Sequence, residues 1–396
     1  MELLAPAGNF EKLVTAVHFG ADAVYFSGKS FGLRAFAGNF SDDEIVEAMK
    51  YLHERGKKGY ITLNIVANDE DFSKELDKYL KLLESAKVDG VIVSDLGLIS
   101  YIREHVPSLH VHVSTQANVN NTQSAKVYAD MGATRIVLAR EMNLKQIKVM
   151  HASLGDKIEL EAFVHGAMCI SYSGRCLLSN YLTGRPSNRG ACVQACRWKY
   201  YIREESREDE YPIEEDARGT YILNSKDMNM IEHLKEMEDA GVVSLKIEGR
   251  MKSVYYVATV VNAYRQAIDN GYKVDKKLVE ELNKASHRRY TTGFYLGAND
   301  KEFIEDSMPV QTHEFVAQVV DKFDGGVVVE MRNRFVEGEE LEILSPDKTI
   351  FNKMLKMTNM TDENGEAVTD VKNVQQRVRV KTDLPLQVGD ILRRAV

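Results

Sequence analysis

Short apolar runs alternate with amphipathic stretches along the first 170 residues, and this alternation is the strongest constraint on the fold. Apolar runs of four to seven residues that helices separate are typical of parallel strands covered on both faces. The expected strands are Glu2–Pro6, Ala23–Phe26, Gly59–Ile65, Gly90–Val93, His110–Ser114, Thr134–Leu138 and Ile158–Val164. The expected helices are Asp42–His53, Asp71–Ser85, Ser124–Met131 and Leu144–His151, and, later in the chain, Met228–Ala240 and Ser253–Asn270.

A further strand is expected at Val242–Ile247, after the seven strands that precede residue 170. Eight strands of this kind fit a (βα)8 TIM-like barrel better than an open sheet. A doubly wound α/β sheet is the alternative, but no G-x-G-x-x-G pattern follows the first strand to support a dinucleotide fold. We therefore predict a TIM-like barrel domain over residues 1–309.

The pattern changes after about Pro309, where helical periodicity disappears. Four short strands separated by turn signals are expected there, and the turn at Asp324–Gly326 predicts a hairpin. The expected strands are Glu314–Val320, Gly326–Met331, Glu340–Leu344 and Arg377–Val380. We therefore predict a small antiparallel β-barrel domain over residues 310–396.

The overall composition is that of a soluble globular protein, with 44% hydrophobic and 28% charged residues. No apolar run approaches the roughly 20 residues that cross a bilayer, and the start MELLAPAGNFEKL lacks the features of a signal peptide. A cytoplasmic location without a membrane partner is therefore expected. The net charge of −8 argues against binding nucleic acid over the whole surface, but it leaves room for a local basic patch.

All four cysteines lie in one segment, Glu161–Arg203, with the spacing C-x6-C-x15-C-x3-C. Clustered cysteines in a cytoplasmic protein bind metals or do redox work more often than they form disulfides. Four thiolates complete the ligand shell of a 4Fe-4S cluster or of Zn²⁺. Neither pair has the C-x2-C spacing of a zinc ribbon, so a 4Fe-4S cluster is expected first, zinc second and unligated thiols third. The candidate ligands are Cys169, Cys176, Cys192 and Cys196.

The same segment is basic and aromatic, and it contains no acidic residue after Glu161. It is interpreted as an insertion, about residues 166–218, at the C-terminal face of the barrel, which carries the chemistry in this architecture. Arginines interleaved with rings can bind phosphates and stack the bases of single-stranded RNA. Alternatively, they neutralise a metal centre and pack the insertion onto the barrel. The candidate RNA-binding residues are Arg175, Arg185, Arg189, Arg197 and Trp198.

Polar and charged residues also occur at the predicted ends of strands, where a barrel places its active site. Arg and Lys side chains there suit a small substrate with a carboxylate, because a guanidinium group binds a carboxylate bidentately. Each residue alone is more often structural, whereas the set at one face indicates an active cavity. The candidate catalytic residues are Arg140, Glu161, His165, Lys246, Glu248 and Arg250. The candidate substrate-binding residues are Asn64, Gln116, Asn118 and Asn224.

Glu161–Ser179 resembles the signature of the collagenase-like peptidase family U32, E-x-F-x2-G-[SA]-[LIVM]-C-x4-G-x-C-x-[LIVM]-S, at every defined position. The stretches ELLAPAGNFEKL, STQANVNN and KIEGRMKS are also similar to this family, and ACVQACRW is most similar to its tRNA-hydroxylating branch. The resemblance implies that the four cysteines hold a 4Fe-4S cluster. It also implies that wobble uridine is converted to 5-hydroxyuridine with prephenate as the hydroxyl donor.

These inferences together predict an iron–sulfur-dependent hydroxylase that modifies tRNA. The barrel is expected to bind a small carboxylate donor through Arg140, Lys246 or Arg250, and the basic insertion and C-terminal domain are expected to hold the anticodon arm. One alternative is a U32 peptidase that cleaves peptide substrates, for which His165 beside Cys169 is the one close pairing in sequence. Another is a metal-bearing subunit that works only with a paralogous partner, as relatives do.

Overall fold

The computed structural model describes residues 1–32, 38–169, 171–197, 215–216, 219–220, 226–297 and 310–396. The chain forms two compact units. The first contains Met1–Leu13, Ala21–Met251 and Arg288–Pro309, and the second contains Val14–Gly20, Lys252–His287 and Val310–Val396.

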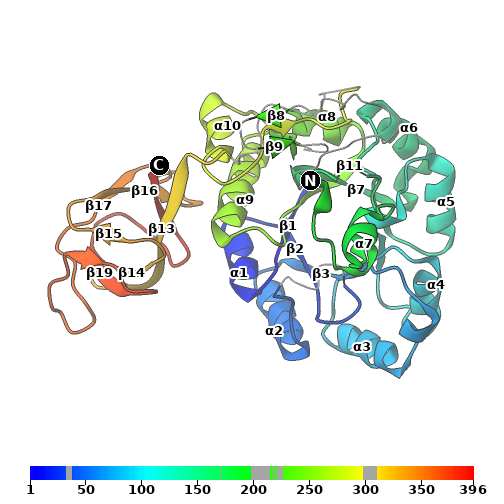
Figure 1. Cartoon of the computed structure of the whole chain (residues 1–396), viewed down its shortest axis with the longest axis horizontal. Helices are drawn as coiled ribbons and strands as arrows, with labels where there is room; N and C mark the ends of the chain where they lie inside the picture. Colours follow the sequence, from blue (N-terminus) through cyan, green and yellow to red (C-terminus); the bar gives the residue numbers. More distant parts are fainter. Residues whose placement is uncertain (33–37, 170, 198–214, 217–218, 221–225, 298–309) are drawn as a thin grey trace. The chain divides into compact units, whose positions relative to one another are not determined.

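The first unit is a closed barrel of eight parallel strands within the described residues, which confirms the predicted TIM-like architecture (Figure 1). The strands pair in sequence order, and β11 closes the ring because it pairs in parallel with both β1 and β7. Their bounds are β1 (Glu2–Pro6), β2 (Ala23–Phe26), β3 (Lys58–Leu63), β4 (Gly90–Val93), β5 (Val111–Val113), β6 (Arg135–Val137), β7 (Glu159–Ala167) and β11 (Val242–Ile247).

Helices follow the strands and form an outer ring in Figure 1, so that strands such as β2 and β4 are buried at every residue. This double coverage explains why these strands are continuously apolar. Helix α2 begins where the sequence predicts, because Ser41 and Glu44 form a reciprocal capping box. The ring contains α2 (Asp42–His53), α3 (Lys74–Ser85), α4 (Leu96–His105), α5 (Thr122–Asp130) and α6 (Leu144–Leu154). Helix α1 (Phe10–His18) precedes them in the chain.

The helix predicted at Met228–Ala240 is only partly correct. The segment begins with strand β10 (Asp227–Asn229), and only α8 (Leu234–Asp239) is α-helical. Strand β7 continues past the barrel wall, and its backbone pairs with β10 in antiparallel fashion. Strand β12 (Tyr290–Thr291) then extends this arm in parallel with β10. Backbone pairing with β7 thus overrides the helical spacing of the apolar residues.

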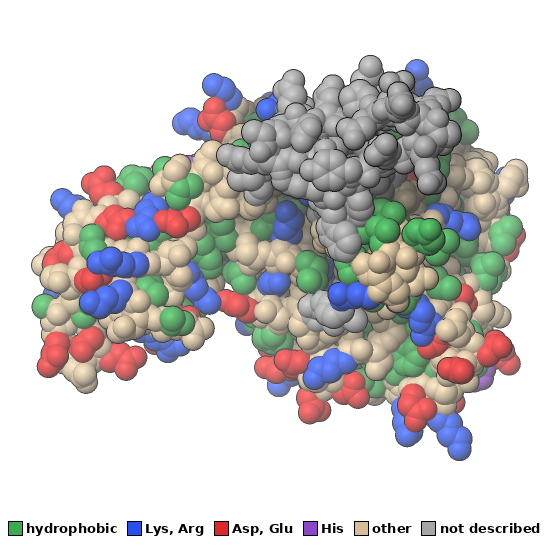
Figure 2. Space-filling model, viewed as in Figure 1, with side chains coloured by type: hydrophobic (Ala, Val, Ile, Leu, Met, Phe, Trp, Pro, Cys, Tyr) green, Lys and Arg blue, Asp and Glu red, His purple; other side chains and the backbone are tan. Residues whose placement is uncertain are grey.

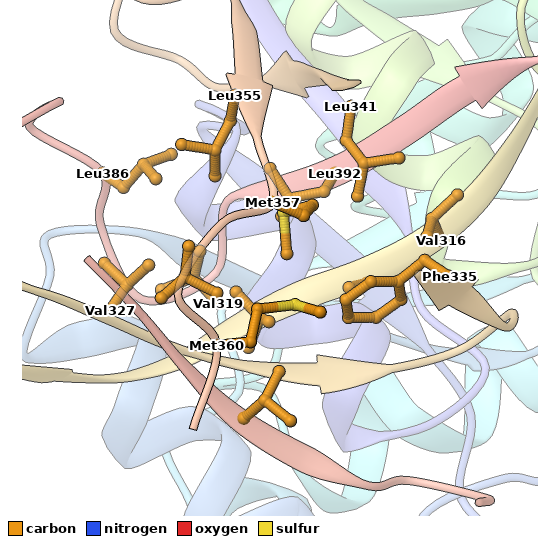
Figure 3. Close-up of a cluster of buried hydrophobic side chains, with 14 of the residues drawn as sticks. Val316, Val319, Val327, Phe335, Leu341, Leu355, Met357, Met360, Leu386 and Leu392 are labelled. Atoms are coloured by element: carbon orange, nitrogen blue, oxygen red, sulfur yellow. The ribbon is translucent and has the colours of Figure 1, made fainter. Parts of the chain in front are cut away.

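The second unit combines α9 (Val254–Asp269) and α10 (Lys276–Leu282) with an antiparallel sheet in the order β17-β16-β20-β13-β14-β19. Alternate residues of these strands pack into one apolar core, part of which is drawn in Figure 3. The sheet strands are β13 (His313–Phe323), β14 (Gly326–Met331), β16 (Glu340–Leu344), β17 (Met354–Lys356), β19 (Arg377–Lys381) and β20 (Ile391–Ala395). Among the described residues, no helix combines the length and apolar character that crossing a bilayer requires.

Candidate active site

A cavity of about 180 Å³ lies at the C-terminal ends of the barrel strands, under the cysteine-containing segment. Its walls come from strand ends throughout the barrel and from residues 169–196. Ten of the residues predicted from sequence line it together. They are Asn64, Gln116, Arg140, Lys246, Glu248, Arg250, Cys169, Cys176, Cys192 and Cys196.

A buried ion network supports the floor of this cavity. The Lys246 ammonium lies 2.7 Å from Glu161 Oε1, and Arg135 Nη1 lies 3.1 Å from Glu161 Oε2. Glu161 is fully buried, and burial alone would raise its pKa. The attraction of Lys246 and Arg135 outweighs burial, so the pKa of Glu161 is lowered and the group is held as a carboxylate. Glu161 therefore acts beneath the cavity, where it orients Lys246, and does not line it.

The Lys246 ammonium also faces two aromatic rings. It lies 4.4 Å from the ring centre of Tyr25 and 5.6 Å from that of Phe163. Both rings line the cavity. Cation–π attraction and the Glu161 carboxylate together fix the ammonium at one position in the floor.

Two arginines add positive charge to the walls. Arg140 stacks 4.0 Å above the Phe163 ring and donates a hydrogen bond of 3.0 Å to the Ala167 carbonyl oxygen. Arg250 donates a hydrogen bond of 2.7 Å to Asn39 Oδ1. Among the described residues that line the cavity, Glu248 is the one acidic residue, and its carboxylate lies 3.9 Å from Arg140. The three cations outnumber the two carboxylates beside them, Glu248 and the underlying Glu161, and this excess favours an anionic ligand.

Six predicted residues that the structure describes lie outside the cavity lining, namely Glu161, His165, Asn118, Arg175, Arg185 and Arg189. His165 is buried in β7, and its ring centre lies 5.3 Å from that of Tyr290. Asn118 has a left-handed backbone, with φ of 54°, and its buried Oδ1 has no hydrogen-bond partner among the described residues. Neither His165 nor Asn118 is part of the cavity wall, so their roles stay predictions.

The cysteine-containing segment is anchored on the barrel rim. Arg189 forms two hydrogen bonds with the Asp71 carboxylate, at 2.9 and 3.1 Å, and a third of 2.6 Å with the Val66 carbonyl oxygen. The hydrogen bonds from Arg189 lower the pKa of Asp71. Gly174 has a φ of +75°, and a β-carbon there would collide with the carbonyl oxygen of Gln116. Arg189, predicted to bind RNA, thus has a structural partner.

Profile comparison places two domains along the chain. The profile described as "Peptidase family U32" matches residues 8–305, and the profile of the U32 C-terminal domain matches residues 311–393. The chain belongs to peptidase family U32.

Relatives in the U32 family have several names. The chain is 38% identical to "tRNA hydroxylation protein P1" of Bacillus subtilis (strain 168), over 99% of this chain and 94% of that protein. It is 37% identical to "23S rRNA 5-hydroxycytidine C2501 synthase" of Escherichia coli (strain K12), over 76% of this chain and 44% of that protein. It is 34% identical to "Collagenase" of Porphyromonas gingivalis (strain ATCC BAA-308 / W83), over 75% and 73%.

None of the four described cysteines of this U32 chain forms a disulfide, and all four line the cavity. Within the described part of the chain, no three His, Cys, Asp or Glu side chains are close enough together to hold a metal ion. The chemistry of the donor set nevertheless fits a thiolate-bound centre, because four cysteines of one segment line one cavity and four thiolates complete such a ligand shell. The residues that would hold such a centre are Cys169, Cys176, Cys192 and Cys196.

Three predicted residues cannot be placed, because Trp198, Asn224 and the side chain of Arg197 lie outside the part of the chain that the structure describes. Other residues of the site were not predicted from the sequence. Arg135 is a charged residue within an apolar strand, and that position signals a buried partner. Thr62, Ser114 and Thr115 also line the cavity, but hydroxyl residues at strand ends carry no distinctive sequence signal.

Proposed function

We propose that this protein is an RNA-modifying hydroxylase that acts on tRNA and converts a wobble uridine to 5-hydroxyuridine. The observation that carries the proposal is one cavity that unites four thiols with three cationic side chains on a barrel rim. Full-length similarity to a protein named for tRNA hydroxylation supports it. The reaction exchanges C5–H of the base for C5–OH, and a donor that exchanges its C–OH for C–H balances it.

The donor is proposed to be a small carboxylate, prephenate, held by Arg140, Lys246 and Arg250. These three side chains supply an excess of positive charge at the floor and walls, and the Glu161 carboxylate prevents Lys246 from turning away. Asn64 and Gln116 supply amide groups that can orient the donor. Aromatic rings line the cavity as well as charged groups, so the cavity can exclude water from the bound donor and base.

The four cysteines are proposed to hold a 4Fe-4S cluster, which would supply electron transfer at the cavity wall when bound. The chain's own contribution is to position the thiols. Ser187 donates a hydrogen bond of 2.7 Å to the Cys176 carbonyl oxygen, and the Gln194 amide lies 3.4 Å from Cys192 Sγ. Zinc is the alternative occupant, and metal analysis after anaerobic purification separates the two.

A gene-deletion strain tests the function directly. Mass spectrometry of tRNA nucleosides should show loss of 5-hydroxyuridine, and the wild-type gene should restore it whereas C176S should not. Unchanged 5-hydroxyuridine in the tRNA of the deletion strain would refute the proposal that this protein modifies tRNA. Complementation with and without a paralogous gene would show whether a partner subunit is needed.

The relative named collagenase makes a peptidase the second candidate. A cysteine peptidase needs one thiol left free as a nucleophile, whereas a four-thiolate centre uses all four. Cleavage of gelatin by metal-free protein, abolished by a single cysteine substitution, would favour the peptidase.

A further inference from the structure

Helix α7 (Leu178–Thr183) has apolar residues on both its buried and its exposed sides. Leu178 and Ser179 line the cavity, and Ser179 is buried. Leu177 and Tyr181 lie one helical turn apart and so share a side. That side faces solvent, with 68% of Leu177 and 86% of Tyr181 exposed.

Two more apolar side chains extend this exposed side, namely Tyr172, which is 54% exposed, and Leu182, which is 42% exposed. We call Tyr172, Leu177, Tyr181 and Leu182 the α7 patch. Figure 2 shows hydrophobic side chains gathered over α7, with Lys or Arg side chains beside them. Tyr172 also lines the cavity, so the patch reaches the cavity mouth.

The support under the patch is firmly hydrogen-bonded. The Ser179 hydroxyl donates a hydrogen bond of 2.9 Å to the Arg185 carbonyl oxygen and accepts one of 3.1 Å from the Val193 amide. The Thr183 hydroxyl donates a hydrogen bond of 2.7 Å to the Ser179 carbonyl oxygen. Exposed rings on a fixed support lose little conformational entropy when a ligand covers them. The patch is therefore organised in advance for binding.

Two arginines flank helix α7 in sequence. Arg175 and Arg185 are exposed on either side of α7 in sequence, and Arg175 forms no ion pair with any acidic residue that the structure describes. No acidic residue occurs between Ala162 and Arg203. Apolar rings beside exposed guanidinium groups match the two faces of single-stranded RNA, its bases and its phosphates.

We propose that the α7 patch is a nucleobase-stacking surface for unpaired loop nucleotides, with Tyr181 as its main ring and Arg175 and Arg185 on the neighbouring phosphates. This inference rests on the proposed function, because it assumes that the cavity receives a base from an RNA loop. The target base passes Tyr172 into the cavity while a neighbouring base stacks on Tyr181. The patch thus selects a loop over a duplex.

Binding of a labelled RNA hairpin by the full-length protein, followed by fluorescence anisotropy, tests this surface. Y181A should weaken binding by about 5-fold to 100-fold, the range for loss of one base–aromatic stack. Y181F should retain binding. Y181L keeps the apolar area but lacks a ring, and it should bind as weakly as Y181A. V149A changes a residue on α6 that is 66% exposed and should bind like wild type.

A fluorescent base analogue in the loop gives a second readout. It should be quenched on binding to wild-type protein and to Y181F, but not to Y181L. R185A should reduce the slope of log Kd against log salt by about one phosphate contact. Equal binding by Y181A and wild type would overturn the stacking surface while leaving the proposed function intact. Wild-type protein that binds no RNA, together with unchanged tRNA in the deletion strain, would overturn both.

Discussion

The two units of the molecule each bury a network of ion pairs. The networks differ in whether one of their charged groups also lines a cavity. In the barrel, the Glu161 carboxylate holds Lys246 and Arg135, and Lys246 still contributes to the cavity wall. In the second unit, Arg393 is fully buried, 2.8 Å from Glu281 Oε2 and 2.6 Å from Glu342 Oε1.

The second network is closed on itself. Lys284 lies 2.6 Å from Glu342 and 3.1 Å from Glu281, so both carboxylates are shared between two cations. These contacts join α10 to strands β16 and β20 within that unit. Burial of a charge is costly, and it persists only with good partners. The closed network holds elements together, whereas the barrel network places a charge at the cavity wall.

Arg393→Met should give the largest loss of stability, because it leaves the fully buried Glu281 with Lys284 as its one remaining ion-pair partner among the described residues. Breaking a buried ion pair costs roughly 3–5 kcal/mol, which urea unfolding of the full chain would measure. Arg394→Met is the matched control, because its half-exposed pairs with Glu314 and Glu339 should contribute less. Equal losses of stability in both variants would show that the buried Arg393 network contributes no more than the partly exposed pairs of Arg394.

Lys246→Met should lower the rate of RNA hydroxylation by about 10²–10³-fold, the range for loss of one preorganised charge. The fold should suffer less than in Arg393→Met, because Glu161 keeps Arg135 as a partner. Mass spectrometry of the modified nucleoside measures the rate, and urea unfolding measures stability. Lys246→Arg, which keeps the charge but not its position, should recover only part of the rate. Full activity in Lys246→Met would show that the barrel network is purely structural.

Acid should weaken both networks. Burial alone would raise the pKa of Glu161 and of Glu342, but their cationic neighbours lower both below the ordinary value of 4.5. A carboxyl with a lowered pKa in the folded state stabilises the protein above pH 4.5 and loses this contribution as the pH falls through its folded pKa. Glu161→Gln should therefore flatten the fall of unfolding free energy with decreasing pH below 4.5. If the unfolding free energy of Glu161→Gln fell with decreasing pH as steeply as that of wild type, the lowered pKa of Glu161 would be contradicted.

Arg189→Ala should have the smallest effect on stability, about 1 kcal/mol or less, because its pair with Asp71 is partly exposed. The variant should lower metal content more than it lowers stability, because Arg189 anchors the cysteine-containing segment to the barrel rim. Metal content after anaerobic purification, compared with that of Arg55→Ala, an exposed surface arginine, would test this.

The sequence predicts the barrel well because parallel strands covered on both faces have a distinctive apolar pattern, as in Gly90–Val93. It also predicts the strand-end cations, because strand order places Arg140, Lys246 and Arg250 at one face. It does not predict which charged residues line the cavity and which lie beneath it. Nothing in sequence separates Glu161, which lies beneath the cavity, from Glu248, which lines it. Likewise, the pairing of Arg189 with Asp71 depends on a contact between segments 118 residues apart.

Strand β7 carries both the buried carboxylate of Glu161 and the Phe163 ring that lines the cavity, and it ends at Ala167, before Cys169. Side chains alternate between the two faces of a strand, so a single-residue insertion or deletion between Glu161 and Phe163 would turn Phe163 toward the opposite face. Phe163 would leave the cavity wall, and Lys246 would lose one of the two rings that face it. The length of β7 thus sets which of its side chains reach the cavity.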